Sequence, residues 1–96
     1  MKISFDPAKR DATLQDRGLD FKDATEVFAG KTLDYEDTRF EYPETRIITA
    51  GHLRGRLVIL VWTQRGETRH IISMRKANER ERARLAARVR ERLGEG

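Results

Sequence analysis

The chain has 96 residues, of which 38% are hydrophobic and 38% are charged, and it contains no cysteine. This length predicts a single domain over residues 1–96, with no room for a second core. The missing cysteines exclude disulfides, thiolate catalysis and zinc–thiolate sites. We find no apolar run long enough for a signal peptide or a membrane span, so the sequence predicts a soluble, cytoplasmic protein with no membrane contact.

The charge is divided unevenly along the chain. Residues 1–44 carry a net charge of −4, whereas residues 45–96 carry +8. An acidic half joined to a strongly basic half favours a polyanion as ligand.

The first third of the chain predicts one strand and two helices. Alternating apolar and polar residues indicate a short strand over Met1–Phe5. Asp6 and Pro7 have the form of a cap and first turn of a helix, which runs to about Arg17 and stops at Gly18. A second helix follows, capped by Asp20 and ended by Gly30, with its apolar residues on one face: Phe21, Ala24, Val27 and Phe28.

The rest of the chain predicts strands and a final helix. Thr32–Asp37 indicates a short edge strand, and residues 46–53 and 56–64 indicate a hairpin around Arg54-Gly55. The nearly all-apolar segment 56–64 predicts the middle of the sheet. A last strand is expected over Thr68–Met74, followed by an arginine-rich helix over Asn78–Leu93.

This order predicts an α+β domain, with an antiparallel sheet of about four strands, two N-terminal helices and one C-terminal helix. We expect the helices to cover one face of the sheet. Strict alternation along the last strand would place Ile71 and Arg75 on one face, and His70 and Met74 on the other.

The corner between the last strand and the final helix is the sharpest candidate site. Arg75 and Lys76 end the strand, Asn78 and Glu81 have the spacing of a helix capping box, and Arg80 lies between them. A helix N-terminus favours anions, so the cluster predicts a phosphate site. The alternative is that these cations pair with nearby glutamates on a solvated surface.

Candidate proton carriers are few. His52 and His70 are the only side chains that titrate near neutrality without perturbation, and His70 has basic neighbours. Glu44 or Glu41 is an alternative base before the strand that begins at Arg46. A structural hydrogen bond is the usual alternative for a lone histidine, and the two histidines make a weak metal site, so no metal is predicted.

Four aromatic residues offer surfaces on which RNA bases can stack. They are Tyr35, Phe40, Tyr42 and Trp62. The end of an apolar strand favours a core role for Trp62 instead. No phosphate-binding loop, dinucleotide fingerprint or metalloprotease motif is present, so we expect no cofactor.

Four segments together resemble the BrnT family of type II toxin–antitoxin ribonucleases, over about residues 3–85. They are FDPAKRDATLQDRGLDFKDATEVF, RIITAG, RGRLVILVWTQRG and RHIISMRKANERERARL. The resemblance implies a RelE-like fold and a toxin that cleaves mRNA without metal, inhibits translation and uses the ribose 2′-hydroxyl as attacking group. It also implies a cognate DNA-binding antitoxin similar to BrnA, in a dimer or a heterotetramer.

The resemblance also assigns positions. Arg75, Arg80 and Glu81 match the family's closing pattern, and Arg46 and Gly51 match its first hairpin strand. Three positions depart from the family: Arg17 stands where relatives commonly have His, His70 where many have Arg, and Leu85 where many have Tyr.

These residues give a hypothesis for RNA cleavage. Arg75 and Arg80 would hold the phosphate, Arg46 would orient it, and His70 or Glu44 would move protons. The residues expected to bind RNA are Lys76, Arg69, Trp62, Arg54 and Arg56, with Arg69 also a candidate for orienting the phosphate. The alternatives are a basic module that binds nucleic acid or a partner without catalysis, and a purely structural role in which the basic helix serves a partner interface.

Overall fold

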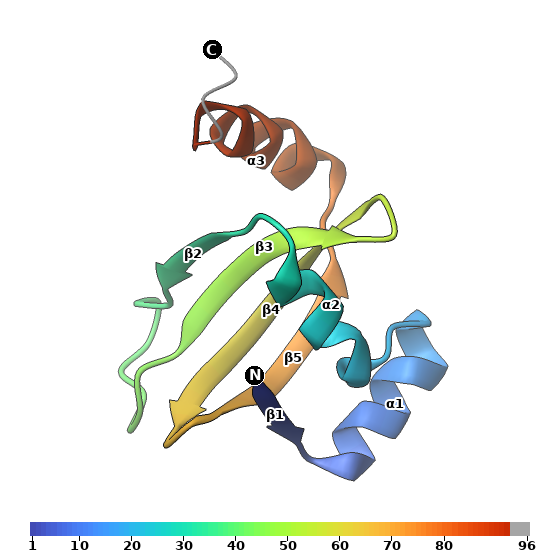
Figure 1. Ribbon diagram of the computed structural model, residues 1–96, viewed down its shortest axis with the longest axis vertical. Coiled ribbons are helices and arrows are strands. Elements are labelled where there is room, and N and C mark those ends of the chain that lie inside the picture. The colour runs from blue at the N-terminus through green and yellow to red at the C-terminus, as the bar shows by residue number, and fades with distance from the viewer. Residues whose placement is uncertain (93–96) are drawn as a thin grey trace.

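The computed structural model describes residues 1–92, so Leu93 of the expected last helix lies outside the described residues. Within this range the chain forms five strands, three α-helices and one 3-10 helix (Figure 1). They are β1 (Lys2–Phe5), α1 (Pro7–Arg17), η1 (Phe21–Asp23), α2 (Ala24–Ala29), β2 (Leu33–Glu36), β3 (Ile47–Leu53), β4 (Arg56–Arg65), β5 (Thr68–Lys76) and α3 (Glu79–Arg92).

The strands form one sheet in the order β1-β5-β4-β3-β2. β1 runs parallel to β5, and the other neighbours are antiparallel. The α+β class is therefore confirmed, but the expectation of about four antiparallel strands is wrong because the sheet has five strands and is mixed. β1 pairs with a strand far along the chain, Ser4 with His70, and such a partner cannot be read from a local pattern.

Local capping signals are confirmed at both ends of α1. The Asp6 side chain accepts a hydrogen bond from the Ala8 amide, and Gly18 adopts a left-handed conformation with φ 69°. The second helix is shorter than expected, because Asp20 caps the 3-10 turn and α2 begins only at Ala24. Arg54 and Gly55 both have positive φ, which the tight β3–β4 hairpin requires.

The two faces of the sheet are covered differently. η1 and α2 lie over one face, which we call the covered face, where Phe21, Val27 and Leu60 form the main core. α1 lies next to η1 beside the β1 edge of the sheet and has no buried residue. α3 lies apart from them at one end of the sheet (Figure 1) and buries Leu85 with Ile59 in a second cluster on the opposite face. We call this opposite side the open face. The expectation that all helices share one face is therefore wrong.

An irregularity in β5 changes which side chains share a face. Val61 pairs with Ser73 and Trp62 with Ile71, so Ile72 has no partner on β4. This β-bulge puts Ile71 and Met74 into the same core on the covered face, and strict alternation was wrong for this pair. Arg75, which pairs with Ile59, lies on the open face.

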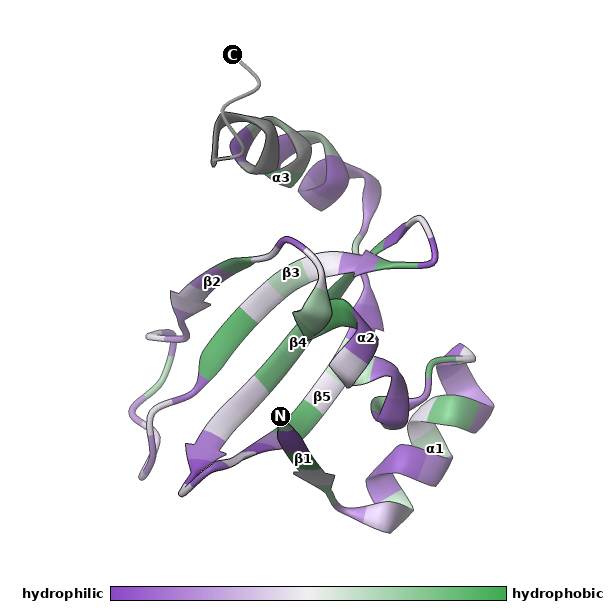
Figure 2. Ribbon diagram, in the orientation of Figure 1, coloured by the Kyte–Doolittle hydropathy of each residue, from purple (hydrophilic) through white to green (hydrophobic). Residues whose placement is uncertain are grey.

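The expected central position of β4 is confirmed. It lies between β3 and β5, and its middle is strongly apolar, whereas α1 and α3 are mostly hydrophilic (Figure 2). Among the described residues no helix is long and apolar enough to cross a membrane.

Candidate functional site

A groove of about 400 Å³ lies on the open face of the sheet. Its walls come from β2 and the segment after it, from the middle strands, and from the first turns of α3. Three arginines from three different parts of the chain line it: Arg39, Arg75 and Arg84. The groove therefore gathers positive charge that is dispersed in the sequence.

Arg75 is fixed in this groove by Glu81. The two guanidinium Nη atoms donate to the two carboxylate oxygens of Glu81 at 2.6 and 2.7 Å. Glu81 is also the capping-box residue, since Asn78 and Glu81 exchange backbone and side-chain hydrogen bonds at 2.7 and 3.0 Å. The bond to Arg75 lowers the pKa of Glu81 to about 2 and raises the pKa of Arg75, so both groups stay charged.

Arg75 remains available to a ligand despite this ion pair. Its side chain is 44% exposed, whereas that of Glu81 is mostly buried. A bidentate pair leaves part of the guanidinium edge and its faces open to a second anion. Glu81 therefore orients Arg75 without removing it from the groove.

A second arginine is held in the same way across the groove. Arg39 donates through Nε and Nη2 to the carboxylate of Asp37, both at 2.8 Å, and the Tyr42 hydroxyl donates to the same carboxylate at 3.1 Å. These bonds hold the pKa of the buried Asp37 far below its ordinary value, with the Arg39 bond as the largest cause. The Arg39 side chain is 65% exposed. Its positive charge acts to lower the pKa of Arg75, as a small contribution against the larger effect of Glu81, because the two like charges lie near each other.

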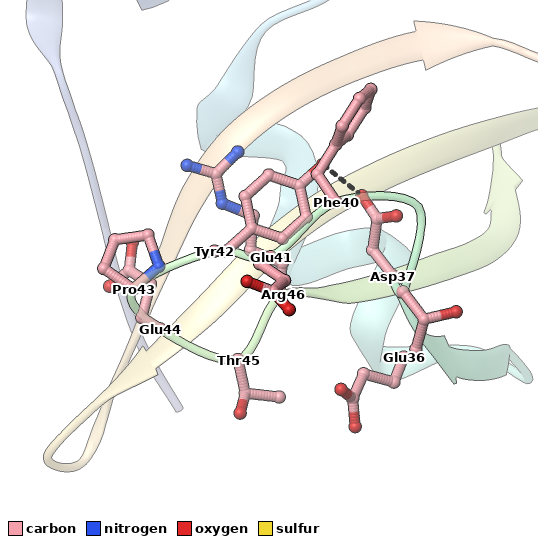
Figure 3. Close-up of a pocket in the computed structure, with 10 residues that line it drawn as sticks. Glu36, Asp37, Phe40, Glu41, Tyr42, Pro43, Glu44, Thr45 and Arg46 are labelled. Carbon is pink, nitrogen blue, oxygen red and sulfur yellow. Dashed lines mark hydrogen bonds between the residues drawn. The ribbon is translucent and has the colours of Figure 1, made fainter.

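A larger cavity of about 540 Å³ adjoins the groove along residues 36–46 (Figure 3). We call it the loop cavity. Its aromatic wall is Tyr42, whose ring lies 4.0 Å from the Arg46 guanidinium carbon and 5.9 Å from the centroid of Phe40. Glu36 and Asp37 line both cavities, so the two adjoin.

The predicted catalytic residues do not all converge. Arg75 lies in the groove, whereas Arg46 and Glu44 line the loop cavity, where Glu44 pairs with Arg65 at 3.6 Å. Arg80 is exposed in the first turn of α3 and lines neither cavity.

His70 is also separate from the groove. It lies five positions before Arg75 on β5, which is about 15 Å along a strand. Its Nδ1 lies 2.9 Å from the Ser4 hydroxyl oxygen, and burial, with a contribution from Arg65, lowers its pKa. These contacts match the structural alternative for this histidine.

Two of the residues expected to bind RNA lie on the wrong side of the sheet for this groove. Trp62 is only 7% exposed, and its Nε1 donates to the Thr49 hydroxyl at 2.7 Å in the core. Arg69 stacks over Phe28 and Trp62 on the covered face, at 4.5 and 4.4 Å. The core role for Trp62 is confirmed, and its ring is not available to a base.

The other expected RNA contacts are peripheral. Arg54 pairs with Asp23 and Glu26 at 3.4 and 3.5 Å, beside the covered face. Arg56 and Lys76 are exposed and line neither the groove nor the loop cavity.

Sequence reasoning missed Arg39, Asp37 and Arg84 as site residues. An aspartate two positions before an arginine was a usable signal, because its carboxylate also accepts from the Arg39 backbone amide at 3.2 Å. Arg84 follows Glu81 by three residues, a spacing that places both on one helix face. Within residues 1–92 no group of three or more histidine, aspartate or glutamate side chains is placed to hold a metal ion.

Comparison with known protein families gives a match over most of the chain. The model of a family described as the ribonuclease toxin, BrnT, of type II toxin–antitoxin systems matches residues 5–81. This range contains Arg39, Asp37, Arg75 and Glu81 but ends before Arg84. No curated protein matches the chain.

Proposed function

Because this chain belongs to the BrnT family of ribonuclease toxins from type II toxin–antitoxin systems, we propose that it cleaves mRNA in the groove and thereby inhibits translation. The observation that supports this most is the position of Arg75, fixed by Glu81 and exposed beside Arg39 and Arg84. We also propose that the fold is a RelE-like variant with an added parallel strand.

The proposed reaction is a transfer within the RNA. The 2′-oxygen loses its proton and forms a bond to phosphorus, the bond to the 5′-oxygen breaks, and that oxygen takes up a proton. The products are a 2′,3′-cyclic phosphate and a free 5′-hydroxyl. Negative charge builds up on the phosphate oxygens in the transition state, and the guanidinium groups of Arg75, Arg39 and Arg84, which line the groove, would stabilise it.

The groove residues contribute less to proton transfer than to charge stabilisation. The carboxylates of Asp37 and Glu81 are both held in ionised, hydrogen-bonded form with a lowered pKa, which makes them weak bases. We therefore assign the gain in rate chiefly to electrostatics and positioning. Tyr35 lines the groove near Arg75, and we propose that its hydroxyl donates the proton that the leaving 5′-oxygen takes up.

The remaining predicted site residues receive secondary roles. Arg80 precedes Arg84 by one helical turn, so it extends the positive charge along α3, and we propose that it contacts a flanking phosphate. Lys76, Arg54 and Arg56 stay predictions as peripheral RNA contacts, since none lines the groove. His70 and Glu44 lie outside the groove, and their catalytic roles remain hypotheses.

Cleavage of end-labelled mRNA by the purified chain tests the proposal. We expect wild-type protein to release fragments with cyclic phosphate ends, with or without a metal chelator. Arg75→Ala should cleave at least about 100-fold more slowly, the typical loss when one charge-stabilising donor is removed. Lys22→Ala, which removes one exposed charge from η1, is the matched control and should cleave at the wild-type rate. Circular dichroism checks folding, and equal rates in wild type and Arg75→Ala would refute the assignment.

A non-catalytic RNA-binding module is the second candidate, favoured by the lowered pKa values of both carboxylates on the groove's charged wall. Such a module would retain RNA intact, with an affinity that falls steeply with salt. The same labelled mRNA separates the two candidates. A denaturing gel shows fragments if the chain cleaves RNA, and a native gel shows an intact but shifted band if the chain only binds it.

The family implies an antitoxin partner. We propose that this partner is a DNA-binding protein similar to BrnA, that it covers the groove with acidic groups, and that the complex is a dimer or a heterotetramer. Growth arrest on expression of the chain, relieved by co-expression of a small DNA-binding protein from the adjacent reading frame, would support this. Growth arrest that persists would contradict it.

A further inference from the structure

We propose that the loop cavity is a base-binding subsite that selects guanine in the RNA strand beside the cleaved phosphate. The inference rests on the proposed function, because it names the part of the substrate that lies next to the groove. It assigns a role to Phe40, Tyr42 and Arg46, which the cleavage step does not use.

The aromatic wall of the cavity is the first reason. Phe40 is 68% exposed, the highest exposure among the large aromatic side chains of the described residues. It meets Tyr42 edge to face, with centroids 5.9 Å apart. An exposed aromatic ring that packs on a second, half-buried ring along a cavity is a surface on which unstacked RNA bases can bind. A base that covers Phe40 would remove its apolar surface from water.

The wall is also preorganised, as Figure 3 shows. The Tyr42 hydroxyl is bound to Asp37, and the Arg46 guanidinium lies 4.0 Å from the ring centroid. Arg46 has a buried Nε that finds no hydrogen-bond partner within the described part of the chain. A buried donor without a partner is uncommon in proteins, and an oxygen atom of a ligand or a bridging water would satisfy it. The wall of the loop cavity thus carries a fixed aromatic ring and a donor that an oxygen atom from outside the chain can satisfy.

The charged residues that line the loop cavity indicate which part of an RNA strand it binds. Glu36 and Glu41 line the cavity, and in the described residues neither forms an ion pair. Four carboxylates and one arginine line the loop cavity, whereas three carboxylates and three arginines line the groove. Carboxylates repel phosphate, so the loop cavity suits a base and the arginine groove suits the backbone. Carboxylates accept hydrogen bonds, and guanine presents two adjacent donors, N1–H and the N2 amine, to a single carboxylate. Uracil presents one N–H between two carbonyls, which carboxylates repel.

The placement of the two cavities fits one strand of RNA. Asp37 and Thr38 line both, and Arg39 of the groove is bound to Asp37. A phosphate held by Arg75 and Arg39 therefore lies beside a base held by Tyr42 and Phe40. Since the phosphate and the base would belong to neighbouring nucleotides, the subsite would set the sequence at which the strand is cut.

Binding of uncleavable RNA tests the proposal directly. The probes are fluorescent 2′-O-methyl oligonucleotides: oligouridine, the same strand with one central guanine, and the same strand with inosine there. We expect wild-type protein to bind the guanine strand about tenfold more tightly than oligouridine in anisotropy titrations, because a hydrogen bond to a carboxylate accounts for a preference of about this size. Inosine lacks the N2 amine and should give an intermediate affinity. Equal affinities, or tighter binding of oligouridine, would overturn the proposal.

Substitutions at Phe40 test whether guanine binds in the loop cavity. Phe40→Ala should abolish the preference for guanine, and Phe40→Trp should keep it, because stacking is retained. Leu14→Ala, which trims a partly exposed side chain on α1, is the control and should bind like wild type. Phe40 is largely exposed, so its removal should leave the thermal midpoint unchanged. A Phe40→Ala protein that retains the full preference would refute the site.

The readout also separates this proposal from the proposed function. Selective guanine binding without cleavage of natural RNA would refute ribonuclease activity and leave the subsite standing. Cleavage at sites without guanine, unchanged by Phe40→Ala, would refute the subsite and leave the ribonuclease standing.

Discussion

Glu81 joins the cap of α3 to the orientation of Arg75. One carboxylate oxygen accepts from the Asn78 backbone amide at 3.0 Å and from Arg75 at 2.6 Å, and the other accepts from Arg75 at 2.7 Å. The start of the helix and the position of the proposed phosphate-binding group are therefore one arrangement, and a change at Glu81 affects both.

Glu81→Gln should reduce the change in the free energy of unfolding between pH 7 and pH 3. The pKa of Glu81 falls from 4.5 to about 2 on folding, so its contribution is present above pH 4.5 and is lost as the pH falls toward 2. We expect Glu81→Gln to be less stable than wild type by about 1–2 kcal/mol at pH 7, a value reduced because Arg75 is well exposed. Urea unfolding at pH 7 and pH 3 measures this.

The control for that experiment is Glu79→Gln. Glu79 lies in the same helical turn, but its side chain is 94% exposed and its contact with Arg82 is 3.9 Å long. It should change the unfolding free energy little at either pH. A Glu81→Gln variant as stable as wild type at pH 7 would show that the ion pair contributes nothing to the fold.

Arg75→Lys tests whether the planar guanidinium is required or only its charge. Lysine keeps the charge but cannot make the paired hydrogen bonds that hold Arg75 on Glu81, so its ammonium group would be less fixed in the groove. We expect RNA cleavage to fall by about 10-fold to 100-fold, less than in the alanine variant. Single-turnover cleavage rates give the comparison, and a lysine variant as fast as wild type would mean that a point charge suffices.

Signals between residues near in the chain predicted the fold well. Asp6, Gly18 and the Asn78–Glu81 capping box behave as the sequence indicates, because each depends on contacts within a few residues. The parallel pairing of β1 and the bulge at Ile72 were missed, since both depend on partners far along the chain. The bulge matters most, because it puts Met74 and Ile71 together in the core.

The site was predictable only in part for the same reason. Arg75 stood out because a strand, a cation pair and a helix cap lie side by side in the sequence. Arg39 joins it only through the folding of β2 against β3, and no local pattern shows which loop reaches the end of β5. His70 drew attention by its residue type, although the strand carries it away from the groove.

Gly51→Ala should destabilise the protein by steric conflict. A Cβ at this position would lie 2.8 Å from Val27 Cγ1 and 3.0 Å from Thr32 Cγ2, and Val27, a residue of α2, is fully buried. Overpacking of this kind costs about 1–3 kcal/mol. In a domain of this size the thermal midpoint should fall by at least about 4 °C, as measured by calorimetry.

Gly30→Ala provides the comparison, since its Cβ would meet only the Val27 carbonyl at an ordinary 3.6 Å and its φ of −89° suits any residue. It should shift the midpoint much less than Gly51→Ala. Equal midpoints for Gly51→Ala and wild type would indicate that α2 moves aside at little cost.

His70→Gln decides whether this histidine moves protons. A general acid or base contributes about 10²-fold to 10⁴-fold to a rate, so a proton carrier at this position would make the variant nearly inactive. His70 lies outside the groove and is bound to Ser4, so we expect cleavage to stay within about twofold of wild type, with the same pH profile between pH 6 and 8.

The His70→Gln substitution should instead change how the stability of the protein depends on pH. Folding lowers the pKa of His70 below 6.5, mainly through burial, so wild type should lose stability as the pH falls through this range, and the variant should not show that loss. Cleavage rates and urea unfolding at pH 5 and pH 8 test both expectations, and a large loss of activity would return His70 to the catalytic site.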